Sequence, residues 1–134
     1  MSTLKVNTIQ NTSAGHSSTP EQIAQGRAKI WACINGTNTP AFHDSYNCTS
    51  LTDNDTGDWT LNFSITMGNT GYSASCMSEN WEGTNIDSYT VLSEYYQVRT
   101  TTTMRFRCMR LRYDSQSPQF KDSRIMGITI FGDV

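Results

Sequence analysis

Side chains that could act as an acid, a base or a nucleophile are few in this sequence and lie far apart. His16 lies in a polar N-terminal stretch and His43 in an expected strand, and neither has a partner nearby in the sequence. An isolated histidine of this kind is more often structural or solvated than catalytic. The sequence contains no Gly-x-Ser-x-Gly elbow, no phosphate-binding loop and no His-Glu-x-x-His motif. We therefore expect no catalytic residue, no cofactor and no enzymatic activity.

The cysteines have the wrong spacing for a metal site. They are spread along the chain without a Cys-x-x-Cys pair, whereas structural zinc sites use closely spaced pairs. Each lies in an expected strand among apolar neighbours, where a thiol behaves as a small hydrophobic side chain. The four residues are Cys33, Cys48, Cys76 and Cys108. We expect buried thiols and no bound metal, with disulfides as the alternative.

Two charged patterns have an ordinary structural explanation. The stretch 53–57 (Asp-Asn-Asp-Thr-Gly) resembles the start of a calcium-binding loop, but Ser64 occupies the position of the closing glutamate. The same residue types form turns, and we favour a turn here. Arg105 and Arg107 share one face of an expected strand and could bind an anion or a neighbour's carboxylates. A pair of solvated surface charges is the favoured interpretation of these arginines.

Aromatic residues in and after one expected loop are the best candidates for a binding surface. Aromatic side chains on or beside loops offer a large contact area at low entropic cost, and they can stack on sugars or bind proteins. The candidates are Trp81, Tyr89, Tyr95 and Tyr96. Ordinary packing between strands is the commoner role of such residues and is the alternative.

The composition indicates one domain that binds neither nucleic acid nor membrane. A chain of 134 residues can bury one core but not two. Charged residues make up only 16% of the sequence and the net charge is −2, so no basic surface for nucleic acid is expected. No apolar run is long enough to span a membrane, and the first residues lack the order of a signal peptide. We expect synthesis in the cytoplasm.

Residues 52–65 are the pattern around which the other elements can be placed. The first part is rich in turn formers and includes Gly57, which is free to adopt a positive φ angle. The second part alternates between apolar and polar side chains, which predicts a strand with one apolar face. The apolar residues are Trp59, Leu61, Phe63 and Ile65. A turn followed by an amphipathic strand is the repeating unit of an antiparallel sheet.

Similar patterns predict further strands along the rest of the chain, and residues 78–87 and 113–124 are expected to be loops. The expected strands are residues 28–34, 41–51, 72–77, 88–93, 95–100, 101–112 and 125–131. In the second of these, Phe42, Tyr46 and Cys48 fall on one face and Leu51 is out of step, which predicts a β-bulge. The expected fold is all-β: an antiparallel β-sandwich or small barrel of about seven or eight strands.

One short helix is expected at about residues 19–26, at the start of a β-domain that covers residues 18–134. Thr19 can cap this helix, Pro20 suits its first position, and Gln22 completes a capping box. Gly26 is expected to end the helix in a left-handed conformation.

Residues 1–17 are expected to form an extended arm that serves in attachment and oligomerisation. The arm is polar, and its apolar side chains, chiefly Leu4, Val6 and Ile9, are too few to hold it in place. A neighbouring subunit is the expected partner, and packing against its own domain is the alternative. Trp31 lies on the face opposite Ile30 and also indicates a second covered surface, either within the sandwich or on another subunit.

Several motifs together resemble one protein family. They are Thr-Leu-Lys-Val-Asn-Thr-Ile-Gln-Asn-Thr-Ser at residues 3–13, Thr-Pro-Glu-Gln-Ile at 19–23, Gly-Arg-Ala-Lys at 26–29, Asn-Gly-Thr at 35–37, Thr-Asp-Asn at 52–54, Gly-Asp-Trp-Thr-Leu-Asn-Phe at 57–63 and Ile-Phe-Gly-Asp at 130–133. In combination they resemble small, tail-fibre-like virion structural proteins of tailed bacteriophages, particularly marine phages and cyanophages. The resemblance covers most of residues 1–66 and the last ten. Residues 67–124 match less well, and the four cysteines depart from the family and leave their redox state open.

The resemblance implies a non-enzymatic virion protein located on the tail or capsid surface. Such proteins are generally homotrimers or multimers fixed to the particle, so the implied partners are other copies of the chain and other virion proteins. The arm would attach the protein, and the loops would face outward toward a host surface glycan or protein. A capsid decoration or cement protein is the first alternative function, and a carbohydrate-binding module of cellular origin is the second.

Overall fold

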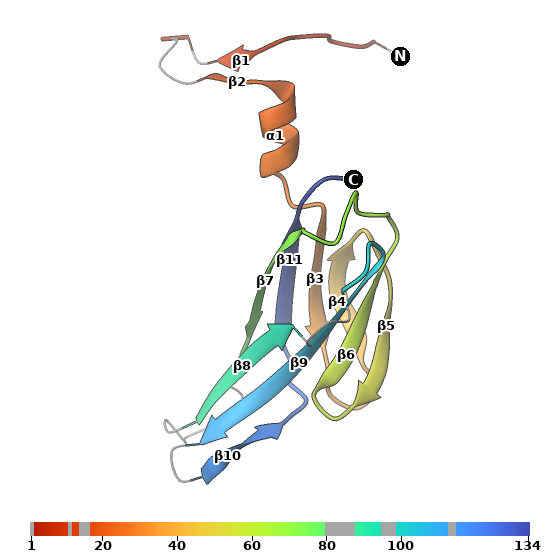
Figure 1. Cartoon of the computed structure of the whole chain (residues 1–134), viewed down its shortest axis with the longest axis vertical. Helices are drawn as coiled ribbons and strands as arrows, with labels where there is room; N and C mark the ends of the chain where they lie inside the picture. The colour runs from red at the N-terminus through yellow and green to blue at the C-terminus, as the bar shows by residue number, and fades with distance from the viewer. Residues whose placement is uncertain (1, 11, 14–16, 80–87, 95–98, 113–114) are drawn as a thin grey trace.

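The computed structural model describes residues 2–10, 12–13, 17–79, 88–94, 99–112 and 115–134. Within these residues the chain forms eleven strands and one short helix (Figure 1). In chain order the elements are β1 (Ile9–Gln10), β2 (Ser17–Ser18), α1 (Pro20–Gly26), β3 (Ile30–Asn35), β4 (Ala41–Tyr46), β5 (Cys48–Asp55), β6 (Asp58–Phe63), β7 (Ser73–Ser78), β8 (Ser88–Glu94), β9 (Thr103–Arg112), β10 (Ser115–Phe120) and β11 (Met126–Phe131).

Nine of these strands form two antiparallel sheets that pack face to face (Figure 1). The first sheet has four strands in the order β4-β3-β11-β7. Its centre is set by Ile128 of β11, which lies opposite Ala32 on one side and Cys76 on the other. The sheets do not close into a barrel, so the predicted all-β sandwich is confirmed and the barrel alternative is wrong.

The second sheet has five strands and is organised by the long strand β9. Phe106 of β9 pairs with Trp59 of β6 on one edge and with Glu94 of β8 on the other. Further along β9, Arg110 pairs with Gln119 of β10 and with Thr90 of β8. Because each residue has only two edges, β6 and β10 share one edge of β9 and β8 takes the other. Strand β5 completes the sheet beyond β6.

The core lies between the sheets and is filled by the apolar side chains that alternate along the strands. Trp59 stacks on Phe106 with ring centroids 5.7 Å apart, and Phe63 meets Tyr72 edge-on at 5.9 Å. The inward residues of four strands are buried: Ile30, Ala32 and Ile34; Trp59, Leu61 and Phe63; Met104, Phe106 and Cys108; Ile128 and Ile130. Of the apolar face predicted for residues 59–65, Ile65 lies beyond the end of β6 and is only partly buried. Each large side chain removed from water contributes about 1.5–3 kcal/mol, so this core is the main source of stability.

The predicted strand at residues 41–51 is two strands that belong to different sheets, so that prediction was wrong. The chain leaves β4 at Asn47, which has a φ of +57°, and enters β5 in the opposite sheet. A register shift at His43 also moves Phe42 and Tyr46 to opposite faces of β4, because Phe42 pairs with the buried Ile34 and Tyr46 with Trp31. The bulge predicted before Leu51 is confirmed, because the register of β5 shifts between Cys48 and Ser50.

Two expected loops are partly strand. Residues 115–120 form β10, although residues 113–124 were expected to be a loop around Pro118. Pro118 fits this position because β10 is short and its ladder with β9 is irregular between Ser115 and Gln119. Likewise, Asp53 and Asp55 lie in β5, so the turn in the stretch 52–57 is shorter than expected. Gly57 does have the predicted positive φ, at +68°.

The helix forms where the sequence predicted it and with the predicted start. Thr19 accepts a hydrogen bond from the backbone nitrogen of Gln22 at 3.1 Å, and the Gln22 side chain accepts one from the backbone nitrogen of Thr19 at 2.9 Å. This reciprocal pair is the capping box. The left-handed stop at Gly26 is wrong, because among the described residues Gly57 is the glycine with a positive φ. The chain instead leaves α1 through Arg27 in an extended conformation.

Candidate partner-binding surfaces

The aromatic candidates lie almost wholly outside the described residues. Trp81, Tyr95 and Tyr96 fall outside them, as does His16. Tyr89 lies in β8 opposite Leu111 of β9, but its side chain is outside the description. The aromatic binding surface therefore stays a prediction. The surfaces that can be built from described residues lie elsewhere, on the arm and on the two outer faces of the sandwich.

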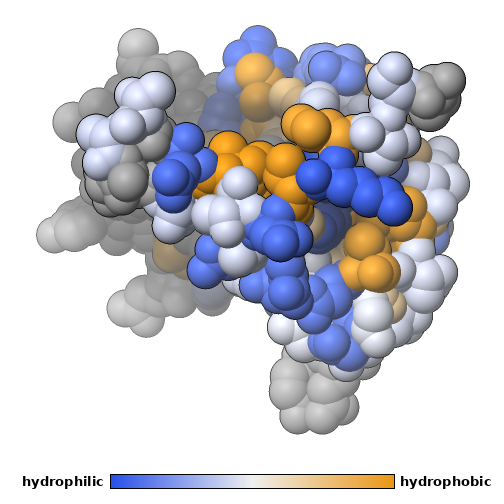
Figure 2. All heavy atoms as spheres, turned by 90° about the horizontal axis from the view of Figure 1, so that it is seen from above, coloured by the Kyte–Doolittle hydropathy of each residue, from blue (hydrophilic) through white to orange (hydrophobic). Residues whose placement is uncertain are grey.

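The described part of the arm stands away from the sandwich (Figure 1). Ile9 and Gln10 pair with Ser18 and Ser17, so the arm folds back on itself just before α1. The apolar side chains of the arm are exposed: Leu4 by 86%, Val6 by 38% and Ile9 by 54%. Figure 2 looks onto this end of the molecule, where hydrophobic side chains are exposed between hydrophilic ones. This exposure opposes the alternative in which the arm packs on its own domain.

Helix α1 is fixed to the sandwich and holds the arm out. The Lys29 ammonium group donates a hydrogen bond of 2.6 Å to the carbonyl of Ala24, in the last turn of the helix, where a cation is favoured. The backbone nitrogen of Lys29 donates to the carbonyl of Ile130 at 2.8 Å, and Asn47 donates its side-chain amide to the carbonyl of Lys29 at 2.7 Å. Residue 29 therefore links the helix, β11 and the crossing between β4 and β5.

A groove of about 440 Å³ lies at the same end of the sandwich as α1. Its lining residues are Arg27, Ala28, Lys29, Trp31, Tyr46, Asn47, Ile65 and Val134. Trp31 and Tyr46 lie opposite each other on β3 and β4, and 53% of Tyr46 is exposed. The sequence indicated that Trp31 covers a second surface, and the structure places it in this groove on the outer face of the four-stranded sheet.

A second apolar region lies farther along that outer face. Cys33, Gly127 and Met77 form a row across β3, β11 and β7. Met77 is 71% exposed, and a Cβ added at Gly127 would lie 3.2 Å from its side chain. A second, smaller groove of about 330 Å³ runs along this row to Ile125. An exposed row of this kind is typical of a surface that contacts another molecule.

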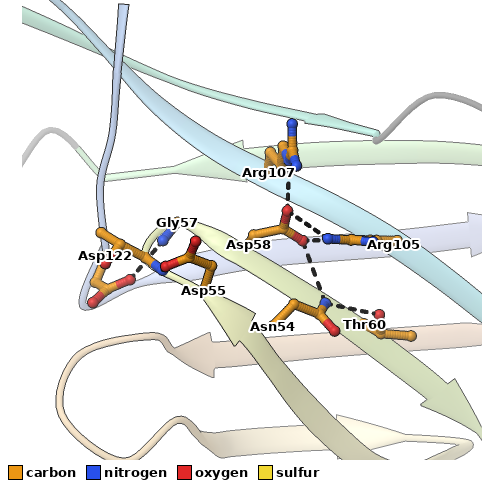
Figure 3. A network of polar contacts seen from close by, with 9 residues as sticks. Asn54, Asp55, Gly57, Asp58, Thr60, Arg105, Arg107 and Asp122 are labelled. Carbon is orange, nitrogen blue, oxygen red and sulfur yellow. Dashed lines mark hydrogen bonds and ion pairs between the residues drawn. The ribbon is translucent and has the colours of Figure 1, made fainter.

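The outer face of the five-stranded sheet carries a network of polar side chains (Figure 3). Asp58 is 2% exposed and accepts two hydrogen bonds from Arg105, at 2.7 and 2.9 Å, and one from Arg107, at 2.5 Å. Asn54 donates to Asp58 at 3.3 Å and to Thr60 at 3.0 Å. The interpretation of Arg105 and Arg107 as solvated surface charges is therefore wrong, because they bind a buried carboxylate of their own chain.

The electrostatics of this network favour the charged carboxylate. Burial by itself disfavours the ionised form, but the hydrogen bonds and charges of Arg105 and Arg107 outweigh it and hold the pKa of Asp58 below its usual value. Arg107 also lies over the ring of Phe120, with its guanidinium carbon 4.8 Å from the ring centroid. The network joins β5, β6 and β9, and Arg107 extends it to β10.

The turn between β5 and β6 packs closely against β9 and against residues 121–122. The backbone nitrogen of Gly57 donates to the Asp122 carboxylate at 2.8 Å, and the carbonyl of Gly57 accepts from the backbone nitrogen of Cys108 at 2.9 Å. A Cβ at Gly57 would lie 2.6 Å from the backbone nitrogen of Lys121. Among the described residues no cluster of His, Cys, Asp or Glu side chains could hold a metal ion.

In the described part of the chain, the side chains that could act as a base or a nucleophile are a histidine on the surface and four cysteines. The His43 ring lies 3.1 Å from the backbone carbonyl of Arg124, on the surface. All four cysteines are free thiols. Cys108 is buried as expected, but the expectation of burial was wrong for Cys33, Cys48 and Cys76, which are only partly buried. Burial raises the pKa of Cys48, Cys76 and Cys108 to about 11, which disfavours the reactive thiolate.

Comparison of this chain with protein-family profiles, with curated proteins and with solved structures finds no match. Among the described residues, no helix is long and apolar enough to cross a membrane. The candidate surfaces therefore rest on the geometry of this chain.

Sequence reasoning missed the Asp58 network and the groove because both combine residues that lie far apart in the sequence. Asp58 was read as part of a turn, and a buried carboxylate could have been suspected only from Trp59 beside it and from two arginines on a later strand. The groove joins residues from four separate segments, so only Trp31 gave a signal for it.

Proposed function

We propose that this chain is a non-enzymatic structural protein of a tailed-bacteriophage particle, a tail-fibre-like subunit that assembles through its N-terminal arm. The observation that supports the assembly role is the arm itself. Its apolar side chains Leu4, Val6 and Ile9 are exposed on a segment that α1 holds away from the sandwich. The motif resemblance across residues 1–66 supports the phage origin.

Within this proposal the β-domain presents the loop and strand region 78–96 outward. Trp81, Tyr89, Tyr95 and Tyr96 are the candidate contacts with a host surface glycan or protein. The same architecture would suit a decoration protein of the capsid, in which these aromatic residues bind nothing. The two functions differ in whether the particle needs these residues to attach to cells.

Incorporation into particles tests the role of the arm. Replacing Leu4, Val6 and Ile9 together by Ser removes the apolar side chains and leaves the core intact, so the β-domain should fold. We expect particles that lack the protein. The matched control replaces Lys5, Asn7 and Thr8 by Ser, changes the same number of arm residues, and should leave incorporation normal. Equal incorporation of both triple variants would contradict the assembly role.

Adsorption of the particles to host cells tests the loops separately. Replacing Trp81 and Tyr95 by Ala should leave incorporation unchanged and weaken adsorption, because an aromatic hot spot commonly contributes more than about 1–2 kcal/mol to binding. Multivalent display multiplies that loss over many copies. Particles of this double variant that adsorb normally would reject receptor binding and favour the decoration protein.

A further inference from the structure

We propose that the arm of one copy, residues 2–10, binds in the groove formed around Trp31 and Tyr46 on a second copy of this chain. The proposal rests on the assembly role given to the arm above, and it names the surface that receives the arm. Both parts belong to the same chain. The groove is lined by Arg27, Ala28 and Lys29, which directly follow α1, and the arm extends from the other end of α1 (Figure 1). Each exposes apolar side chains that its own copy leaves uncovered.

The arm has the pattern of a strand that places two side chains on one surface. In an extended chain Leu4 and Val6 point to the same side and Lys5 to the other. Described residues of the arm line none of the groove in their own copy. The groove is therefore available, and the arm offers a row of aliphatic side chains to fill it.

Within one copy of the chain, the arm is held away from the groove. The seven residues of α1 span about 10 Å at 1.5 Å per residue, and the hydrogen bond from Lys29 to Ala24 fixes the end of the helix. The β1–β2 pairing then turns the arm across the far end of the helix. Folding back would require breaking the Lys29–Ala24 hydrogen bond or the β1–β2 pairing, whereas a second copy can meet the arm without changing either.

The groove suits an aliphatic strand. Trp31 and Tyr46 form a cross-strand aromatic pair on its wall, and Ala28 and Ile65 add apolar surface. Arg27 and Lys29 also line the groove, so a strand that points its lysine away from the floor is preferred. When Leu4 and Val6 face the groove, Lys5 points to the opposite side of the strand, away from the groove.

The distribution of charge also favours a second copy as the partner. The arm holds one of the ten Lys and Arg residues and none of the twelve Asp and Glu residues, so residues 18–134 carry a net charge of −3. The body as a whole therefore attracts Lys5, and a strand with Leu4 and Val6 facing the groove places Lys5 away from Arg27 and Lys29. Exchange of an identical element between protomers is a low-cost route to a closed assembly.

Sedimentation of the full-length protein tests the proposal with a matched pair of groove variants. Tyr46→Lys places a cation on an exposed wall of the groove, beside Arg27 and Lys29. Leu111→Lys makes the same kind of change at an exposed site on the outer face of the five-stranded sheet, outside both grooves. We expect wild type and Leu111→Lys to sediment as a multimer, and Tyr46→Lys to fall to the 15.0 kDa monomer with an unchanged circular dichroism spectrum.

A mixing experiment then identifies which parts meet. The variant with Leu4 and Val6 both changed to Glu keeps its groove, and Tyr46→Lys keeps its arm, so each alone should be monomeric. Their mixture contains one intact arm and one intact groove, and we expect a mixed species of at least twice the monomer mass. A mixture that stays monomeric, with wild type multimeric, would overturn the proposal.

The remaining outcomes separate this proposal from the assembly role of the arm. Loss of multimers in the arm variant, with Tyr46→Lys unaffected, would mean that the arm acts in assembly but binds elsewhere, so only the groove proposal would fail. An arm variant that stays multimeric would overturn both proposals. Wild type that sediments at 15.0 kDa at every concentration would overturn the second copy as the partner and leave attachment to another virion protein as the role of the arm.

Discussion

The two outer faces of the sandwich differ in what their side chains bind. The outer face of the five-stranded sheet is called the polar face, and that of the four-stranded sheet the apolar face. On the five-stranded sheet, Asp58, Asn54, Thr60 and the two arginines of β9 bind one another, so this face is complete within one chain. On the four-stranded sheet, Tyr46 and Met77 are more than half exposed. Polar groups can satisfy each other locally, whereas exposed apolar groups gain only by removing surface from water. The difference indicates which face needs a partner.

The largest effect should come from removing the acceptor of the polar face. Asp58→Asn removes the buried charged acceptor of hydrogen bonds from Arg105 and Arg107, and this loss costs about 3 kcal/mol of the free energy of unfolding. Urea denaturation at pH 7 measures it. Asp133→Asn is the control, because Asp133 is exposed and its loss should cost less than about 0.5 kcal/mol. Similar losses in both variants would mean that the polar face is not held by Asp58.

Gly57→Ala should come next, because this turn ties the polar face to β9. Alanine at a φ of +68° costs about 1–3 kcal/mol in backbone strain, and the added Cβ would also meet the Lys121 backbone. Gly26→Ala is the control, since a Cβ there meets nothing within 4 Å and alanine favours a helix. Thermal unfolding should show a lower midpoint for Gly57→Ala alone. A Gly57→Ala variant as stable as wild type would contradict this geometry of the turn.

The polar face should also make stability depend on pH at acid values. The pKa of Asp58 is lower in the folded than in the unfolded state, so its contribution is complete above the unfolded value, which is near 3.8, and is lost as pH falls through the folded value. The free energy of unfolding of wild type should therefore decrease more steeply between pH 5 and pH 2 than that of Asp58→Asn. Parallel pH profiles for the two proteins would refute this assignment.

Smaller changes should distinguish the two faces directly. Thr60→Ala removes the acceptor of the Asn54 amide and should cost about 1 kcal/mol. Met77→Ala removes an exposed side chain and should change the free energy of unfolding by less than about 0.5 kcal/mol. Chemical denaturation of both variants at a concentration where the protein is monomeric provides the comparison. A larger cost for Met77→Ala would show that the apolar face is already covered within one chain.

Thiol reactivity compares the apolar face with the core in the wild-type protein, without any substitution. A thiol reagent should count four thiols in denaturant without reductant, since all four cysteines are free. In the folded protein, Cys33 on the outer face should react well before Cys108, which is 0% exposed and whose pKa burial raises to about 11. Faster reaction of Cys108 than of Cys33 would mean that the inner and outer faces of β3 and β9 are misassigned.

Alternation within a regular strand predicted which of its side chains face the core. Alternation with a period of two is a local property of a strand, so Trp59, Leu61 and Phe63 were assigned correctly without a partner strand. The capping box of α1 could be predicted for the same reason, because all of its groups lie within four residues. The arm residues Leu4, Val6 and Ile9 were likewise identified from their own neighbourhood.

The tertiary structure decided everything that depends on register between distant strands. Asp58 and Arg105 are 47 residues apart, and only the pairing of β6 with β9 brings the carboxylate between the two guanidinium groups. The change of sheet at Asn47 and the shift at His43 reversed the predicted face of Tyr46 and brought it beside Trp31 in the groove. A bulge or a crossing reverses parity for every residue beyond it, so alternation alone cannot predict which distant side chains meet.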